Sequence, residues 1–574
     1  MYDNQKNLPK LPLPSLSDTC NKLLKWSKPL INDEDYNASL VSVNEFISPE
    51  GIGPALENKL IDWYHAQENN DSWLEPFWYD AYLKNRVPLP INSNVSFILD
   101  KNESVKGLSQ CELAASLAIA LFQYSKIIND ENLPIDYQGK KPLCMSQYKT
   151  LFGTSRIPYL DKDYLFTDVH SKHIVFIIEG HYYSLDVLDD KGEVKDYLTI
   201  LKSIEWMIGN FSGNTKDDSI GNLTTSNRDT WAKARNHLIE IDQKNKKYIG
   251  LIESALIIIV LDQKEYCKND ILFKNMLCGD SNNRWYDKSI QFIITKDAHI
   301  SLNYEHSGVD GTTISSLDKY LFNEMKNYDN SNDGVEQLLP EELIFEKDDY
   351  IISEIEKAKF ESQSAFDQLD IEVLFFDNFG KQLLKDNKTS PDSIIQIAIQ
   401  LAQHKTFGRV FNVYEAASTK QFLHGRTEAM RSVTEESIKF INDKTKKNLF
   451  IASKKHIERI IECKNGYGID RHLFGLNKMH EKYHGNEKFP IIFTTASYKV
   501  LSYNKFSTST SSSTGVILAG YGPVVNDGFG LRYLIYDDEL HFVLSSKFEN
   551  KDNLLRLKDN LENSLDEIAS ILRG

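Results

Sequence analysis

The sequence predicts an α/β protein built from two mixed domains. A chain of 574 residues is too long for a single hydrophobic core. Strand-like alternation of apolar residues occurs beside helical patterns in two stretches, one from about residue 165 to 310 and one from about 349 onward. The polar and acidic segment from about 327 to 347 lies between them. We therefore expect the second mixed domain to begin near residue 349.

Local signals predict the elements of the first half. Alternate prolines in Leu8–Pro14 forbid a helix and predict an extended arm, and helical patterns follow up to about residue 90. Apolar alternation predicts two hairpins. One joins 173–180 to 182–187 around Glu179-Gly180, and the other joins 289–295 to 299–304.

The second half shows fewer but equally clear signals. Pro391 at a first helical position, with Ser390 before it as an N-cap, predicts a helix from Pro391 to Lys405. Strands are predicted at 372–376 and near residues 516 and 541. The tract 507–514 contains only Ser and Thr, which favours a flexible loop over a catalytic use on composition alone.

Composition and charge exclude several partners. The net charge of −16 argues against nucleic acid and against an anionic membrane surface, so an anionic ligand has to be held by local lysines and arginines. The six cysteines are scattered, which fits a reducing compartment. No apolar run is long enough to span a membrane. We expect a soluble, cytoplasmic protein, with a mitochondrial location as the alternative.

The segment Tyr304-Glu305-His306-Ser307-Gly308-Val309-Asp310-Gly311 is the most informative one. A predicted strand runs directly into His306, so the imidazole is expected to point inward together with Tyr304. Asp310 could hold one ring nitrogen and leave the other free to accept a proton. On these residues alone, a buried structural histidine is the better interpretation.

Further motifs resemble one family and occur in its order along the chain. They are the proline-rich opening, Ser155–Pro158, Asn283–Ser289, Tyr304–Gly311, Gly425–Glu428, Asp470–Leu473, Ser507–Ser509 and Tyr521–Val525. These blocks resemble the choline/carnitine O-acyltransferases. Ser507–Thr510 and Asp527–Gly530 look most like the inner mitochondrial carnitine palmitoyltransferases, whose membrane-associating insert has no counterpart before Arg156.

The resemblance implies a specific architecture. It implies two similar chloramphenicol-acetyltransferase-like domains, each with a mainly antiparallel sheet and flanking helices, and an active-site tunnel at their interface. Residues 61–348 would carry the catalytic histidine, and 349–574 with 1–60 would form the other domain. The family is typically monomeric. Acyl-coenzyme A and carnitine would be the substrates, so coenzyme A is no cofactor, and no metal is expected.

The resemblance also implies a mechanism without an acyl-enzyme. His306 would take the proton from the carnitine hydroxyl as its oxygen attacks the thioester, with Asp310 as the partner of the imidazole. Ser509 would donate a hydrogen bond to the oxyanion, an interaction of about 3 kcal/mol.

Binding residues follow from the same resemblance. Lys381 and Lys385, four apart on one face if helical, would hold the 3′-phosphate of coenzyme A, and Asp392 would contact its adenine. Without the resemblance, a solvated helix end would be the better interpretation of these three residues.

Carnitine recognition is implied at three other positions. Tyr414, Thr427 and Arg471 would bind the carnitine carboxylate, and Thr427 with Arg471 favours carnitine over choline. Ala416 departs from the family, which usually has a serine there. Tyr521 could face the trimethylammonium group, with a core tyrosine as the equal alternative.

Acyl length is expected to depend on residue 519. A bulky residue there restricts family members to short chains, whereas glycine opens space for long ones. Ala519 is small, which favours medium or long acyl chains over acetyl.

Two other classes of function compete with this interpretation. His480-Glu481-Lys482-Tyr483-His484 fits the zinc-protease helix motif, although its surroundings look like an exposed helix end and no third ligand is obvious. The protein could also bind acyl-coenzyme A without turnover. The presence of His306, Asp310, Ser509 and Arg471 argues against that loss of activity.

Overall fold

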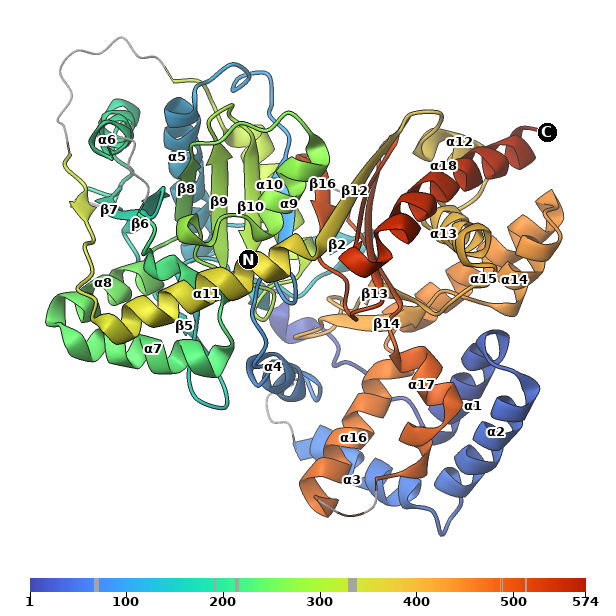
Figure 1. Ribbon diagram of the computed structural model, residues 1–574. Coiled ribbons are helices and arrows are strands. Elements are labelled where there is room, and N and C mark those ends of the chain that lie inside the picture. Colours follow the sequence, from blue (N-terminus) through green and yellow to red (C-terminus); the bar gives the residue numbers. More distant parts are fainter. Residues whose placement is uncertain are drawn as a thin grey trace.

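The protein folds into two β-sheets, each flanked by helices, with a third group of helices beside the second sheet (Figure 1). The computed structural model describes residues 1–66, 72–189, 192–211, 216–328, 338–485, 487, 489–511 and 514–574. The predicted α/β class with two sheets and flanking helices is confirmed.

The first sheet has eight strands within the described residues, in the order β11-β7-β6-β8-β9-β10-β1-β16. The pairs β6–β8 and β8–β9 are parallel, and the other pairs are antiparallel. Their bounds are β1 Val95–Leu99, β6 His173–Ile178, β7 His181–Asp186, β8 Ile258–Asp262, β9 Ile290–Thr295, β10 Ile300–Tyr304, β11 Glu341–Glu342 and β16 Val516–Gly520.

The second sheet has six strands within the described residues, in the order β12-β18-β17-β15-β13-β14. It repeats the pattern of the first sheet, because two successive parallel pairs, β13–β15 and β15–β17, lie between antiparallel ones. The strands are β12 Leu369–Phe376, β13 Val413–Ser418, β14 Thr427–Arg431, β15 Phe506–Thr510, β17 Phe529–Ile535 and β18 Leu540–Lys547.

Helices cover both sheets (Figure 1). Around the first sheet lie α5 Gln110–Asn129, α6 Tyr197–Asn210, α7 Arg228–Ile241, α8 Gln243–Ser254, α9 Asn269–Cys278, α10 Gly311–Glu324 and the long α11 Asp349–Asp367. Around the second lie α12 Lys381–Asp386, α13 Pro391–Phe407, α14 Glu435–Asn442, α15 Lys446–Lys464 and α18 Lys551–Arg573.

Helix α5 is long and apolar enough to pass a length-and-composition test for a membrane span. However, 72% of its most apolar window is buried inside the protein. Its residues Leu113, Leu117 and Leu121 are fully buried in the core beneath the first sheet. We therefore interpret α5 as the core helix of this half of the molecule.

The N-terminal helices pack against helices of the C-terminal half. Helices α1 Leu16–Ser27, α2 Asp33–Ile47 and α3 Ile52–Ala66 lie beside α16 Asp470–His484 and α17 Ala496–Ser502 (Figure 1). Inside this group, Ser27 donates a hydrogen bond to Ser497 over 2.8 Å. Helix α4 Glu75–Leu83 follows, near the centre of the molecule.

Most predicted elements are present with small shifts in their ends. Strands β6–β7 and β9–β10 are the two predicted hairpins, and Ser390 accepts a hydrogen bond from the amide of Ser393 as the N-cap of α13. Two short ladders, β2 Tyr137–Gln138 with β3 Lys141–Pro142 and β4 Thr154–Ile157 with β5 Tyr164–Thr167, were not predicted.

Two segments differ from expectation. Residues 506–510 form β15, paired on both sides, so the first part of the Ser/Thr tract is a strand and not a loop, while 512–513 lie outside the described residues. Strand β16, from the C-terminal half, pairs with β1 in the first sheet. The proposed division into 61–348 and 1–60 with 349–574 stays a prediction, and β16 crosses it.

Candidate active site

The loop between β10 and α10 holds His306 in one orientation. Its Nδ1 lies 2.7 Å from the backbone oxygen of Val309, which can only accept a hydrogen bond, so Nδ1 carries the proton. Nε2 is therefore the basic nitrogen. Burial is the main cause that lowers the pKa of His306 below its ordinary value. With 28% of its side chain exposed, the neutral imidazole remains accessible.

Asp310 lies beside His306, as predicted, but its closest contacts are to other residues. Its Oδ1 is 3.8 Å from His306 Nδ1, whereas Oδ2 accepts a hydrogen bond from Gln147 at 2.7 Å and pairs with Arg426 at 2.8 Å. Burial alone would raise the pKa of Asp310, but the charge of Arg426 and the other contacts hold it below the ordinary value. The carboxylate therefore stays ionised and favours a positive charge on His306.

Arg426 connects this loop to the second sheet. It is buried, and its guanidinium donates to the backbone oxygens of Ser307 at 2.7 Å and His306 at 3.0 Å. These bonds, together with the ion pair to Asp310, fix the loop that carries the imidazole.

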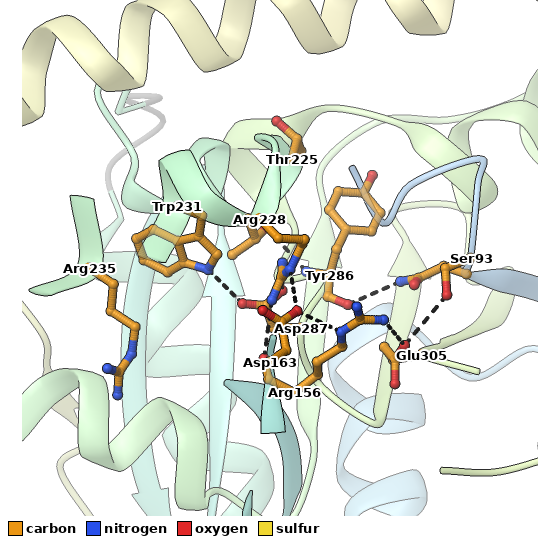
Figure 2. Close-up of polar contacts among 12 residues, drawn as sticks. Ser93, Arg156, Asp163, Thr225, Arg228, Trp231, Arg235, Tyr286, Asp287 and Glu305 are labelled. Carbon is orange, nitrogen blue, oxygen red and sulfur yellow. Dashed lines mark hydrogen bonds and ion pairs between the residues drawn. The ribbon is translucent and has the colours of Figure 1, made fainter. Parts of the chain in front are cut away.

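A buried ionic network holds Glu305, the residue at the start of the same loop (Figure 2). Arg228 lies between Asp163 and Asp287, at 2.7 Å and 2.6 Å. Arg156 pairs with Asp163 at 2.8 Å and with Glu305, the residue before His306, at 3.2 Å. The network therefore ties the start of the loop that carries His306 to β4, α7 and the loop before β9.

Ser509 lies on β15, next to Arg532 of the parallel strand β17. Residues 506–508 are buried, whereas Ser509 is partly exposed at the end of the strand. On the same face, the Ser507 backbone oxygen accepts a hydrogen bond from Tyr521 at 3.0 Å. The Tyr521 hydroxyl is thus bonded to β15.

The three predicted carnitine residues come together. Arg471 donates through Nε to the Thr427 backbone oxygen at 2.8 Å, and its Nη2 lies 3.4 Å from the Thr427 hydroxyl. Burial raises the pKa of Tyr414, against the nearby charge of Arg471 and a hydrogen bond with Thr427. Because residues two apart on a strand share a face, Ala416 lies on the same face of β13 as Tyr414.

An aromatic side chain of α4 joins this cluster to the histidine loop. The Trp78 ring centroid is 4.4 Å from the Arg471 guanidinium and 5.7 Å from that of Arg426. On the same helix, the ring of Tyr82 meets that of His306 edge-on at 5.9 Å. The imidazole and the Arg471 cluster are therefore parts of one site.

The predicted coenzyme A residues lie beside the second sheet, with the start of α12 bonded to the turn between β17 and β18. Lys381 and Lys385 are both on α12, and Lys381 pairs with Asp537 at 2.6 Å. Lys385 is exposed. Asp392, in the first turn of α13, accepts a hydrogen bond from the buried Tyr533 at 2.6 Å, so one of its oxygens faces the sheet.

The sequence model of the Choline/Carnitine o-acyltransferase family matches residues 11–563. The chain belongs to this family. Carnitine O-acetyltransferase of Columba livia is 33% identical over 100% of this chain and 94% of that protein. The mitochondrial carnitine O-palmitoyltransferase 2 of Mus musculus is 29% identical over 94% of this chain and 88% of that protein.

Solved structures are similar as well. The trichothecene 15-O-acetyltransferase of Fusarium sporotrichioides matches 86% of this chain and 94% of its own length, with 9% sequence identity and a TM-score of 0.39.

Both histidines of the competing zinc motif lie on α16. His480 is buried, contrary to the expectation of an exposed helix end, and its ring stacks on that of His484 with centroids 5.5 Å apart. His484 contacts Glu487 at 2.9 Å. Among the described residues, the one group with metal-like geometry lies elsewhere, at Asp392, Glu415 and His456.

Several site residues of this family member were not predicted. Arg426 lies inside the quoted Gly425–Glu428 block, so its motif was a usable signal. Gln147 and Trp78 had no sequence signal, since an isolated glutamine or tryptophan is ordinary in any sequence. Only the fold brings Gln147 to Asp310 and Trp78 to Arg471.

Proposed function

We propose that this protein transfers acyl groups reversibly between coenzyme A and the hydroxyl of carnitine, with His306 as the general base. The observation that carries the proposal is the fixed tautomer of His306. Its Nδ1–H is held by the Val309 oxygen, which leaves a neutral, accessible Nε2.

In the proposed reaction, one proton passes from carnitine through His306 to the thiolate of coenzyme A. The carnitine oxygen forms a bond to the thioester carbon while its proton passes to His306 Nε2. The tetrahedral oxyanion would accept a hydrogen bond from Ser509. The carbon–sulfur bond then breaks, and the proton on Nε2 passes to the departing thiolate. The reverse reaction uses the same groups.

The Arg471 cluster supports carnitine as the acceptor. A guanidinium beside a threonine and a tyrosine hydroxyl suits a carboxylate, which carnitine has and choline lacks. The names of the relatives from Columba livia and Mus musculus agree with this choice. Ala416 supplies no hydroxyl beside the carboxylate.

Coenzyme A would approach the edge formed by α12. Lys381 would exchange Asp537 for the 3′-phosphate, with Lys385 of the same helix as the second charge, and the adenine would lie near Asp392. The thioester would then reach His306 through the predicted tunnel between the two sheets. No cofactor or metal takes part in this scheme.

Three finer properties remain predictions. The monomeric state is one. The cytoplasmic location is another, and the mitochondrial alternative has support in the name of the Mus musculus relative. The medium- or long-chain preference rests on Ala519 alone, whereas the relatives that match over the whole chain include acetyltransferases.

The proposal is tested by release of free coenzyme A thiol from acetyl-, octanoyl- and palmitoyl-coenzyme A. Carnitine and choline are compared as acceptors, with a chelator present. We expect carnitine-dependent release that His306→Ala abolishes while circular dichroism shows unchanged folding. Release with neither acceptor would overturn the proposal and favour a protein that binds acyl-coenzyme A. Activity lost only with chelator would instead favour a metal enzyme.

A further inference from the structure

A buried arginine lies next to the predicted oxyanion donor. Arg532 on β17 is 4% exposed and pairs in register with Ser509 on the parallel strand β15. Directly paired residues on adjacent strands point to the same side of a sheet. The side chain of Arg532 therefore leaves the sheet on the face that carries Ser509.

The Arg532 guanidinium lies against the start of α10. Its Nη2 donates a hydrogen bond to the Ser511 hydroxyl at 2.9 Å, and its Cζ is 4.5 Å from the centre of the Phe97 ring. A Cβ atom at Gly311, the residue after Asp310, would lie 3.1 Å from Nη2. Glycine at this position thus gives the guanidinium the space that it occupies.

The charge of Arg532 has no close counter-ion in the described part of the chain. No carboxylate there lies within 4.0 Å of it, and its Nε has no hydrogen-bond partner there. Asp318 on α10 is buried, and neither of its carboxyl oxygens has a partner among the described residues. Burial raises the pKa of Asp318 well above its ordinary value, against the charge of Arg532, which favours the neutral form of this carboxyl.

These groups lie close to Ala519. Phe97 on β1 pairs directly with Ala519 on β16, and such pairs have Cβ atoms about 5 Å apart on one face. The Phe97 ring lies 5.8 Å from that of Tyr304, which lies 5.6 Å from His306. The rings of Tyr304 and Phe97 therefore connect the imidazole to Ala519, and the guanidinium lies against the Phe97 ring.

We infer that Arg532 is a specificity-determining residue that limits the acyl group to short chains. An acetyl group would leave the bond to Ser511 intact. A long alkyl chain beside Ala519 would surround a charged group with hydrocarbon and displace its polar contacts, which is unfavourable. The small side chain at 519 then does not by itself open the pocket, and the preference is for acetyl rather than for the medium or long chains expected from Ala519 alone. This inference rests on the proposed function.

The experiment compares kcat/KM for acetyl- and octanoyl-coenzyme A, with carnitine as acceptor. We expect the unmodified protein to prefer acetyl. Arg532→Ala removes the charge and volume, and should raise the octanoyl-to-acetyl ratio about tenfold or more. Arg532→Lys keeps the charge and should keep the preference. Arg409→Ala, at an exposed arginine stacked on Phe411, is the control and should leave the ratio unchanged.

The outcomes separate this inference from the proposed function. No carnitine-dependent release with either thioester would defeat the proposed function itself. Release with octanoyl preferred by the unmodified protein would overturn the role of Arg532, whether or not any variant folds. A folded Arg532→Ala protein with an unchanged ratio would overturn it as well.

Discussion

Asp310 and Arg426 form an ion pair of 2.8 Å that joins the two halves of the chain at the active site. Asp310 precedes α10 beside the first sheet, and Arg426 immediately precedes β14 of the second. The same carboxylate lies 3.8 Å from His306. The position and the charge environment of the proposed base thus depend on both sheets being correctly packed together.

Asp310→Asn should move the acid limb of the pH profile. Burial and Arg426 lower the pKa of His306, whereas Asp310 raises it. Without the carboxylate, the pKa falls further, so the neutral base persists to lower pH. We expect the acid limb of the pH profile of kcat/KM for carnitine to shift to lower pH. The maximum of the profile should fall about tenfold or more. The exposed Asp386→Asn serves as control. An acid limb shifted to higher pH in Asp310→Asn would contradict the role of Asp310 as the group that raises the pKa of His306.

Arg471→Asn should weaken carnitine binding selectively. Loss of a charged hydrogen-bond donor is expected to raise the KM for carnitine on the order of 10- to 100-fold, because such bonds contribute about 1.5–3 kcal/mol. The KM for acetyl-coenzyme A should change little. Steady-state kinetics with each substrate varied in turn gives both values, with Arg409→Asn as the matched control. Equal increases in both constants would rule out a carboxylate role.

Lys381→Ala should raise the KM for acetyl-coenzyme A about three- to tenfold, since a partly exposed charge pair is worth little more than 1 kcal/mol. The decisive comparison uses dephospho-acetyl-coenzyme A, which lacks the 3′-phosphate. With this substrate, the variant and the unmodified protein should have similar constants. Lys25→Ala, at an exposed lysine of α1, is the control. An equal increase in KM with acetyl-coenzyme A and with its dephospho form would show that Lys381 does not bind the 3′-phosphate.

Arg228→Met should destabilise the fold by about 3–5 kcal/mol, because it leaves two buried carboxylates, Asp163 and Asp287, without their shared partner. Urea unfolding followed by tryptophan fluorescence measures the loss. Arg556→Met, at an exposed arginine of α18, should change stability by no more than about 0.5 kcal/mol. A loss below about 1 kcal/mol for Arg228→Met would show that the network is not structurally important.

Local elements were predictable because their signals are local. The two hairpins and the capped α13 follow from alternation, turns and an N-cap that act within a few residues. The ordered motifs likewise indicated His306, Thr427 and Arg471, and the structure places them in one region, with Trp78 and Tyr82 between them.

The Ser/Thr tract shows where local signals fail. Its composition suggests a loop, yet Thr508 is fully buried, and β15 is paired on one side with β13 and on the other with β17. Two partner strands satisfy its backbone, and the β-branched threonine fits a pleated surface. Pairing with distant segments decided this conformation.

The sequence by itself determined the α/β class, the order of the family motifs and the candidate reactive side chains. Only the tertiary structure decided which of these side chains meet. The ion pair of Arg426 with Asp310, and the placement of Arg532 against Phe97, both join residues far apart in the chain. Such contacts depend on strand order and on packing between the sheets, because neither charge pairing nor ring stacking leaves a periodic trace in the sequence.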